Sequence, residues 1–277
     1  MDGVWYRGNE RPIVWDFEAP LERNKCKGVV VFCHGYKGFK DWGGFAHMSK
    51  FFVENGFALF KFNFSCNGGT AENPIDFPDL TAFGENTFSQ EIADLHFVFD
   101  QIQKGSGEMA HYQNLPLHLI GHSRGGGMAI LTANALPVVS FATWAAVSDF
   151  APRFPADVSE WQKNGVAYIQ NARTGQDMPH LFSFYQDFKD NQARLSIPNY
   201  AQGIQKPWFL AHGTGDTTVG MSEAERLAVW GGSWVRTCFI EGSSHTFGCS
   251  QPWISDSVPT DFRNLIVSTI SFFESNQ

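Results

Sequence analysis

The 277-residue chain has few charged residues, no basic cluster and no low-complexity tract. Charged residues make up 17% of the sequence, and the formal net charge is −8 at pH 7. A negative chain without a basic run is poorly suited to a phosphate backbone, so we expect no nucleic-acid partner. Hydrophobic residues make up 43% of the chain, which supplies a core and excludes a disordered, collagen-like or coiled-coil protein.

Cysteines are also sparse, and no two of them have the Cys-x-x-Cys spacing. An odd number of scattered cysteines in a large domain indicates reduced thiols rather than a disulfide framework. The spacing indicates no zinc site, and the sequence contains no His-Glu-x-x-His motif, so we expect no bound metal. The five cysteines are Cys26, Cys33, Cys66, Cys238 and Cys249.

Long apolar runs that would indicate a signal or a membrane span are missing as well. The N-terminal residues 1–7 contain no apolar signal core, which predicts a cytoplasmic protein. Residues 128–147 are apolar, but Asn134 and Pro137 divide them into two short runs. A buried helix followed by a buried strand explains this segment better than a membrane span, so we expect no membrane partner.

Short apolar segments alternate with amphipathic ones along most of the chain. Continuous apolar strands between helices are typical of an α/β protein with a largely parallel sheet covered by helices on both faces. Apolar residues among the first 20 positions predict additional edge strands. We expect strands near residues 29–33, 57–64, 117–120, 140–148, 208–211 and 235–240, and helices near residues 41–55, 85–103, 125–136, 221–230 and 262–273.

The alternation is interrupted between Asp149 and Lys206, where only helix-like pieces near residues 158–164 and 179–189 stand out. A structureless loop of this length is improbable in a compact domain. We therefore interpret residues 1–277 as one domain, with an inserted cap at about residues 150–205. The cap's aromatic residues form its own small core or line a pocket for an acyl group, and the candidates for the pocket are Trp161, Tyr168 and Phe184.

The segment Gly121-His122-Ser123-Arg124-Gly125 fits the G-x-S-x-G pattern and lies between an expected strand and an expected helix. This context is the one that the motif requires, because a sharp strand-to-helix turn exposes the serine hydroxyl. The flanking glycines lack a Cβ that would clash in such a turn. A serine hydroxyl is a weak nucleophile until a base removes its proton, so a histidine and an orienting acid are also needed.

Asp216 and His245 follow the next two expected strands and are the candidates for these partners. In a parallel sheet all three side chains lie beyond the carboxyl ends of strands, where they can converge. Asp149 is the alternative acid. The loop His34-Gly35-Tyr36 also leaves the carboxyl end of a strand, and its N–H groups and the N–H of Arg124 are candidates for an oxyanion hole.

The other histidines and three of the arginines are not the first candidates for catalytic or binding roles. His122 lies inside the turn, His34 opens the oxyanion loop and His212 precedes the acid, so these are weaker candidates for the base. The remaining histidines are interpreted as structural or solvated: His47, His96, His111, His118 and His180. Three arginines are interpreted as surface residues, with contact to an anionic substrate as the alternative: Arg153, Arg173 and Arg194.

From Gly28 to the C-terminus the chain resembles the α/β-hydrolases, because the G-x-S-x-G turn is followed by Asp216 and then His245. Within that fold it resembles small serine esterases of the dienelactone-hydrolase-like and feruloyl-esterase-like groups. True dienelactone hydrolases have cysteine at the position of Ser123. This departure favours ordinary ester hydrolysis over dienelactone chemistry.

The resemblance implies that Ser123 attacks an ester carbonyl, that His245 acts as the base and that Asp216 orients His245. It implies that the backbone N–H groups of Tyr36 and Arg124 stabilise the oxyanion. It also implies a small-molecule ester as the partner and no cofactor. A peptidase or amidase of the prolyl-oligopeptidase-like branch and a non-catalytic binding protein remain alternatives, and the oligomeric state stays open.

Overall fold

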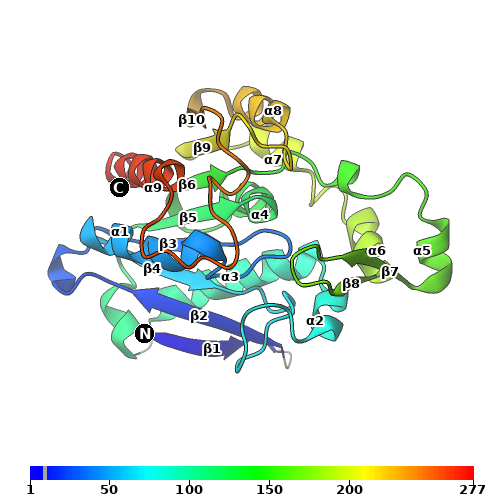
Figure 1. Cartoon of the computed structure of the whole chain (residues 1–277). Coiled ribbons are helices and arrows are strands. Elements are labelled where there is room, and N and C mark those ends of the chain that lie inside the picture. Colours follow the sequence, from blue (N-terminus) through cyan, green and yellow to red (C-terminus); the bar gives the residue numbers. More distant parts are fainter. Residues whose placement is uncertain (9–10, 106) are drawn as a thin grey trace.

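An eight-stranded sheet runs through the molecule, and its strands are the apolar segments of the sequence (Figure 1). The structure, a computed structural model, describes residues 1–8, 11–105 and 107–277. The strand order is β1-β2-β4-β3-β5-β6-β9-β10. The strands are β1 (Asp2–Tyr6), β2 (Pro12–Glu18), β3 (Gly28–Cys33), β4 (Phe57–Phe62), β5 (Leu117–His122), β6 (Val138–Trp144), β9 (Trp208–Gly213) and β10 (Val235–Ile240).

The six strands from β4 to β10 in this order are parallel, whereas β1 and β2 form an antiparallel hairpin on the β4 edge. This arrangement confirms the expected α/β class and the expected N-terminal edge strands. Because parallel strands share one carboxyl edge, the loops after β3, β5, β9 and β10 meet there.

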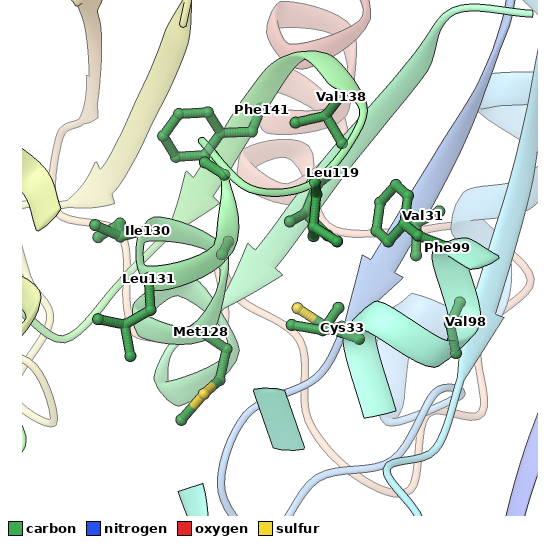
Figure 2. Packing of buried hydrophobic residues seen from close by; sticks show 14 of the residues in the cluster. Val31, Cys33, Val98, Phe99, Leu119, Met128, Ile130, Leu131, Val138 and Phe141 are labelled. Carbon is green, nitrogen blue, oxygen red and sulfur yellow. The ribbon is translucent and has the colours of Figure 1, made fainter. Parts of the chain in front are cut away.

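Helices cover both faces of the sheet, and the strands alternate their side chains between them. Along β3, Val29, Val31 and Cys33 pack on the face covered by α3 (Phe88–Lys104), α4 (Arg124–Thr132) and α8 (Met221–Gly231). The intervening Val30 and Phe32 pack on the face covered by α1 (Met48–Glu54) and α9 (Thr260–Glu274). Figure 2 shows the first of these layers, with Val31 and Cys33 among residues of α3 and α4.

The helix expected over residues 85–103 begins later than predicted. A separate helix, α2 (Leu80–Glu85), precedes it, and the chain is extended at Asn86. The hydroxyl of Thr87 then accepts the N–H of Gln90 at 3.2 Å and caps the start of α3. The periodicity of apolar residues did not show this break, because residues on both sides of it are buried.

The inserted segment between β6 and β9 folds mostly outside the main sheet. Its elements are α5 (Ser159–Asn164), β7 (Val166–Gln170), β8 (Asp177–Leu181), α6 (Phe182–Asp190) and α7 (Ile197–Gln202). In Figure 1 the first four of these stand apart from the main sheet. Strands β7 and β8 pair antiparallel in a sheet of their own, and β8 packs against α2. The helix expected from residue 179 begins at Phe182, because residues 179–181 belong to β8.

Short 3-10 helices complete the connections: η1 (Arg23–Lys25), η2 (Gly43–His47), η3 (Gly107–His111), η4 (Ala151–Arg153) and η5 (Gly232–Trp234). The helix expected over residues 41–55 is divided between η2 and α1. Within the described residues, none of the helices combines the length and apolar character needed to cross a lipid bilayer.

Candidate active site

Ser123 lies in a strained turn between β5 and α4. Its backbone φ is 56° and its ψ is −119°, a combination that serine rarely adopts. Its N–H donates to the carbonyl of Trp144 at 2.8 Å, and its carbonyl accepts the N–H of Gly126 at 3.0 Å. These bonds tie the turn to β6 and to α4, so the hydroxyl is held at the carboxyl edge of the sheet.

Two glycines allow the turn to be this tight. A Cβ at Gly121 would lie 2.2 Å from the carbonyl oxygen of Gly125, and a Cβ at Gly125 would lie 2.5 Å from the carbonyl oxygen of His34. The opposing atoms belong to the backbone and cannot rotate away. The G-x-S-x-G pattern therefore has a steric cause in this molecule.

The structure brings the serine, the histidine and the acid of the sequence analysis together. His245 Nε2 lies 3.0 Å from Ser123 Oγ, and His245 Nδ1 lies 2.7 Å from Asp216 Oδ2. Both distances are within hydrogen-bonding range. Asp216 follows β9 and His245 follows β10, so the neighbouring strands position the two residues. The geometry allows His245 to accept a proton from Ser123 while Asp216 orients the ring.

The carboxylate of Asp216 is buried, and its hydrogen bonds favour the ionised form. Oδ1 accepts the N–H of Thr218 at 2.8 Å and the N–H of Val219 at 2.9 Å, while Oδ2 accepts from His245. Burial alone would raise the pKa of Asp216, but His245 and the two backbone donors outweigh it and lower the pKa. Asp216 is therefore ionised at neutral pH.

Asp149, the alternative acid, has a different role. It follows β6, and its Oδ1 accepts the N–H of Ala151 at 3.0 Å at the start of η4. No hydrogen bond between described residues joins Asp149 to His245. The geometry therefore favours Asp216 as the partner of His245.

The loop after β3 passes directly against Ser123. A Cβ at Gly35 would lie 2.8 Å from the Cβ of Ser123, so this approach requires glycine. The following residue, Tyr36, and the first residue of α4, Arg124, line the same cavity as Ser123. The N–H of Arg124 lies in the first turn of α4, where N–H groups have no partner within the helix. Among the described residues, no backbone carbonyl accepts the N–H of Tyr36.

The side chains of Tyr36 and Arg124 pack against each other. The guanidinium of Arg124 lies 5.0 Å from the centroid of the Tyr36 ring and 2.5 Å from Glu91 Oε1. Burial raises the pKa of Glu91, although Arg124 and Asn86 act in the opposite direction. The ring contact and the ion pair hold the side chains of Tyr36 and Arg124 in place at the wall of the cavity that Ser123 also lines.

Two cavities meet at Ser123 and Tyr36. The smaller has a volume of about 140 Å³ and is bounded by His245, Trp42 and Phe45. The larger has a volume of about 520 Å³ and a mainly apolar wall. Among the described residues that line either cavity, none is Asp or Glu. A serine between two cavities can act on a substrate whose two parts, one on each side of the reacting bond, occupy one cavity each.

Two of the three predicted substrate-binding residues line the larger cavity, and one does not. Trp161 and Phe184 are part of its wall. The prediction for Tyr168 is corrected, because its side chain is 61% exposed. Its neighbours Ala167 and Ile169 line the cavity instead. Alternate residues of a strand point to opposite faces, so a cavity that meets Ala167 and Ile169 excludes Tyr168.

Sequence reasoning missed most of the aromatic wall. Phe150 and Phe154 follow β6, and Phe88 begins α3. The sequence does indicate a position near the site for Phe150, because residues just beyond the carboxyl end of a parallel strand face the site. Phe88 lies far from the motif in sequence, and only the packing of α3 beside α4 brings it to the cavity.

Several histidines other than His245 are buried, and burial keeps their rings neutral. His122 Nε2 bonds to the carbonyl of His245 at 3.0 Å, and burial lowers the pKa of His122 to about 3. His34 accepts the N–H of Phe64, and burial lowers its pKa to about 4. His180, interpreted from sequence as structural or solvated, lies in the wall of the larger cavity and bonds to the hydroxyl of Tyr36 at 2.7 Å.

The three arginines of the sequence analysis lie in different places. Arg153 lines the larger cavity, and its guanidinium is paired with Glu223. Arg173 is paired with Asp76 at 2.6 Å, away from the cavity. Arg194 is exposed beside Asn191. In the described part of the chain, no group of three His, Cys, Asp or Glu side chains is arranged to hold a metal ion.

A known protein family matches this chain. The family described as serine aminopeptidase, S33 matches residues 24–173, which is more than half of the chain. A search of curated proteins finds no relative of this sequence.

Solved structures with a similar fold are numerous, and three illustrate them. Est1E from Butyrivibrio proteoclasticus, solved with ferulic acid bound, is 12% identical with a TM-score of 0.70 over 98% of this chain and 97% of that chain. Mouse alpha/beta hydrolase domain-containing protein 10 is 16% identical, with a TM-score of 0.70 over 100% of both chains. A soluble variant of monoglyceride lipase from Saccharomyces cerevisiae, in complex with a substrate analog, is 15% identical, with a TM-score of 0.70 over 99% and 95%. These likenesses show the shared fold alone.

Proposed function

The chain belongs to the serine aminopeptidase, S33 family and has the α/β-hydrolase fold, and from this premise we propose that it hydrolyses carboxylic esters of small molecules. The observation that carries the proposal is the contact of Ser123 Oγ with His245 Nε2, which in turn contacts Asp216 through Nδ1. This chain of hydrogen bonds activates a hydroxyl as a nucleophile.

In the proposed reaction Ser123 Oγ attacks the ester carbonyl while His245 Nε2 takes the hydroxyl proton. His245 then gives that proton to the departing alkoxide, which leaves an acyl group on Ser123. Water next attacks the acyl-enzyme with His245 again as base, and the carboxylic acid is released. Asp216 stays ionised throughout and stabilises the imidazolium, which agrees with its lowered pKa.

The proposed oxyanion hole consists of the backbone N–H groups of Tyr36 and Arg124. The close approach of Gly35 to Ser123 and the position of Arg124 in the first turn of α4 support this assignment. The loss of one such donor typically costs roughly 10²–10³ in rate. No metal or organic cofactor takes part in the proposed mechanism.

The cavity walls support an ester rather than a peptide substrate. An aminopeptidase has to recognise a cationic amino terminus, for which a carboxylate is the natural partner. The described residues that line the two cavities include no Asp or Glu, and the larger cavity carries Arg124 and Arg153 instead. We therefore assign the larger cavity to an apolar or aromatic acyl group and the smaller one to the alcohol.

The proposal is tested with p-nitrophenyl esters from acetate to decanoate, together with methyl ferulate because Est1E is solved with ferulic acid. We expect turnover by the wild type and a loss of at least about 10⁴-fold in Ser123→Ala. The midpoint of thermal unfolding should stay unchanged in this variant. Substantial turnover by Ser123→Ala, or Ser123-dependent cleavage of peptide p-nitroanilides by a wild type without esterase activity, would refute the proposal.

We also retain the proposed cytoplasmic location. All five cysteines are free thiols, and burial raises the pKa of Cys33, Cys66 and Cys249. Buried, protonated thiols are typical of a reducing compartment. Measurement of free thiols in protein from native cells would detect a disulfide and thereby contradict this location.

A further inference from the structure

The wall of the larger cavity contains one pair of hydrogen-bonded polar side chains among its aromatic rings. His180 of β8 and Tyr36 of the loop after β3 are joined by a bond of 2.7 Å between Nε2 and the phenol oxygen. His180 is only 8% exposed, and both residues line the cavity together with Ser123. The pair therefore lies within reach of an acyl group bound to Ser123.

Among the described residues, the second nitrogen of His180 has no hydrogen-bond partner. The ring packs against Phe83 at 5.5 Å and Phe184 at 5.8 Å, and the backbone carbonyl of His180 accepts Trp161 Nε1 at 2.7 Å. No described residue forms a hydrogen bond with His180 Nδ1, yet this atom is not among the enclosed polar atoms without a partner. Since His180 lines the larger cavity, we infer that Nδ1 faces that space.

The ring is neutral at neutral pH. Burial lowers the pKa of His180 to about 4, and the positive charges of Arg124 and Lys37 act in the same direction. A neutral imidazole has one N–H and one bare nitrogen. If the Tyr36 hydroxyl donates to Nε2, then Nδ1 carries the proton and donates into the cavity. If Nε2 donates to Tyr36, the hydroxyl proton is the free donor. In either arrangement the pair offers one donor to a ligand.

A buried donor discriminates against ligands that leave it unpaired. An alkyl chain in this cavity would cover His180 and Tyr36 without an acceptor for that donor. An oxygen atom at the same position would accept it. The backbone of Tyr36 lies at the proposed oxyanion hole, and its hydroxyl lies at the far end of the side chain. A ligand oxygen that meets this pair is therefore expected several bonds away from the ester carbonyl.

Resting on the proposed ester hydrolysis, we propose that His180 and Tyr36 select acyl groups that carry an ether, carbonyl or hydroxyl oxygen along the chain. The apolar rings around the pair hold the carbon skeleton, and the pair recognises the oxygen. His180 is thus a specificity-determining residue of the cavity.

The test uses three p-nitrophenyl esters of equal chain length: hexanoate, 3-ethoxypropanoate and 4-methoxybutanoate. In each ether one methylene is replaced by oxygen, so the shape is nearly constant. The ratio of kcat/KM for an ether to that for hexanoate is measured in the wild type and in His180→Phe, which keeps a ring but has no nitrogen. The difference in intrinsic reactivity of the esters cancels when the two ratios are compared.

We expect the ratio for at least one ether to fall roughly 3- to 10-fold in His180→Phe, as the loss of one hydrogen bond predicts. His111→Phe, an exposed site outside the cavity wall, should leave the ratio unchanged. Tyr36→Phe breaks the pair from its other side and should also lower the ratio, and it decides the test if His180→Phe does not fold. An equal fall in turnover of all three esters, with unchanged ratios, would overturn the proposal and leave His180 a structural role.

A separate measurement distinguishes failure of this inference from failure of the proposed function. If the folded wild type hydrolyses none of the esters, the proposed function fails, and binding of the intact esters to Ser123→Ala then decides the inference. Quenching of tryptophan fluorescence reports binding, because Trp161 lines the cavity. Tighter binding of an ether than of hexanoate, lost when His180→Phe is added, supports oxygen recognition. Equal affinities overturn it.

Discussion

The Ser123 turn and the inserted segment between β6 and β9 build the same cavity in different ways. The turn is determined by backbone contacts, since a Cβ at Gly121 or Gly125 would clash with neighbouring carbonyl groups. The inserted segment contributes through side chains of short elements, and β7 is mostly exposed. It contacts α2, outside the main sheet, through β8.

The difference indicates which property each region controls. Small changes in the turn move the proposed nucleophile relative to His245, so this region tolerates little variation. Changes in the inserted segment alter the wall of the larger cavity and leave the strand ends in place. We therefore assign the reaction to the sheet edge and the choice of acyl group to the insertion.

The largest expected effect concerns the acid at the sheet edge. Asp216→Asn keeps the size of the side chain but removes the charge that orients His245, so we expect kcat to fall about 10⁴-fold. Asp149→Asn is the matched control, because within the described part of the chain its carboxylate accepts only the N–H of Ala151, and it should change kcat less than about threefold. Initial rates on p-nitrophenyl butyrate measure both. The reverse order would place the acid after β6.

A smaller effect should separate acyl preference from reaction chemistry. Phe184→Ala enlarges the larger cavity, and we expect kcat/KM for octanoate to fall about tenfold, as for a lost apolar contact, with acetate nearly unchanged. Tyr168→Ala removes a similar ring from the exposed side of β7 and should alter neither ester. Equal losses on both esters in Phe184→Ala would contradict the assignment of acyl choice to the insertion.

The last effect is on acid stability rather than on turnover. His118 and His122 lie in β5 and His34 directly follows β3, whereas His180 lies in the insertion. Burial lowers the pKa of His118 to about 3. As the pH falls below about 6.5, this histidine binds a proton in the unfolded state but not in the folded state. The free energy of unfolding therefore decreases as the pH falls. Between about pH 4 and 6, His118→Phe should reduce this dependence by about 1.4 kcal/mol per pH unit.

Urea unfolding at several pH values measures this slope. His118→Phe retains a ring that can stack on Phe273, from which the His118 centroid lies 4.5 Å. His111→Phe changes an exposed histidine and should keep the slope of the wild type. An unchanged slope in His118→Phe would mean that His118 is not held neutral by burial.

The sheet could be predicted from sequence because its strands are continuous apolar runs with a local signal. The strand expected at residues 235–240 coincides with β10, although several of its side chains are exposed. The positions of Ser123, Asp216 and His245 followed from the same reasoning, since each comes just after a strand. These inferences need only local pattern and the shared carboxyl edge of parallel strands.

The insertion was less predictable because tertiary contacts determine its structure. The β7–β8 hairpin packs on α2, which was itself missed, and Tyr168 was assigned to the cavity although alternation along β7 turns it outward. Nothing in the sequence around His180 indicates a position in the cavity wall. Only the structure shows that His180 contacts Tyr36, which is distant in sequence, and that it lines the larger cavity.

The most direct test of the central claim is the intact mass of the protein after rapid mixing with p-nitrophenyl butyrate and an acid quench. We predict a transient increase by one butyryl group, located on Ser123 by peptide mapping and absent from Ser123→Ala. In Asp216→Asn the adduct should form much more slowly. An adduct on another residue, or ester turnover without any adduct on Ser123 at single-turnover times, would contradict the account.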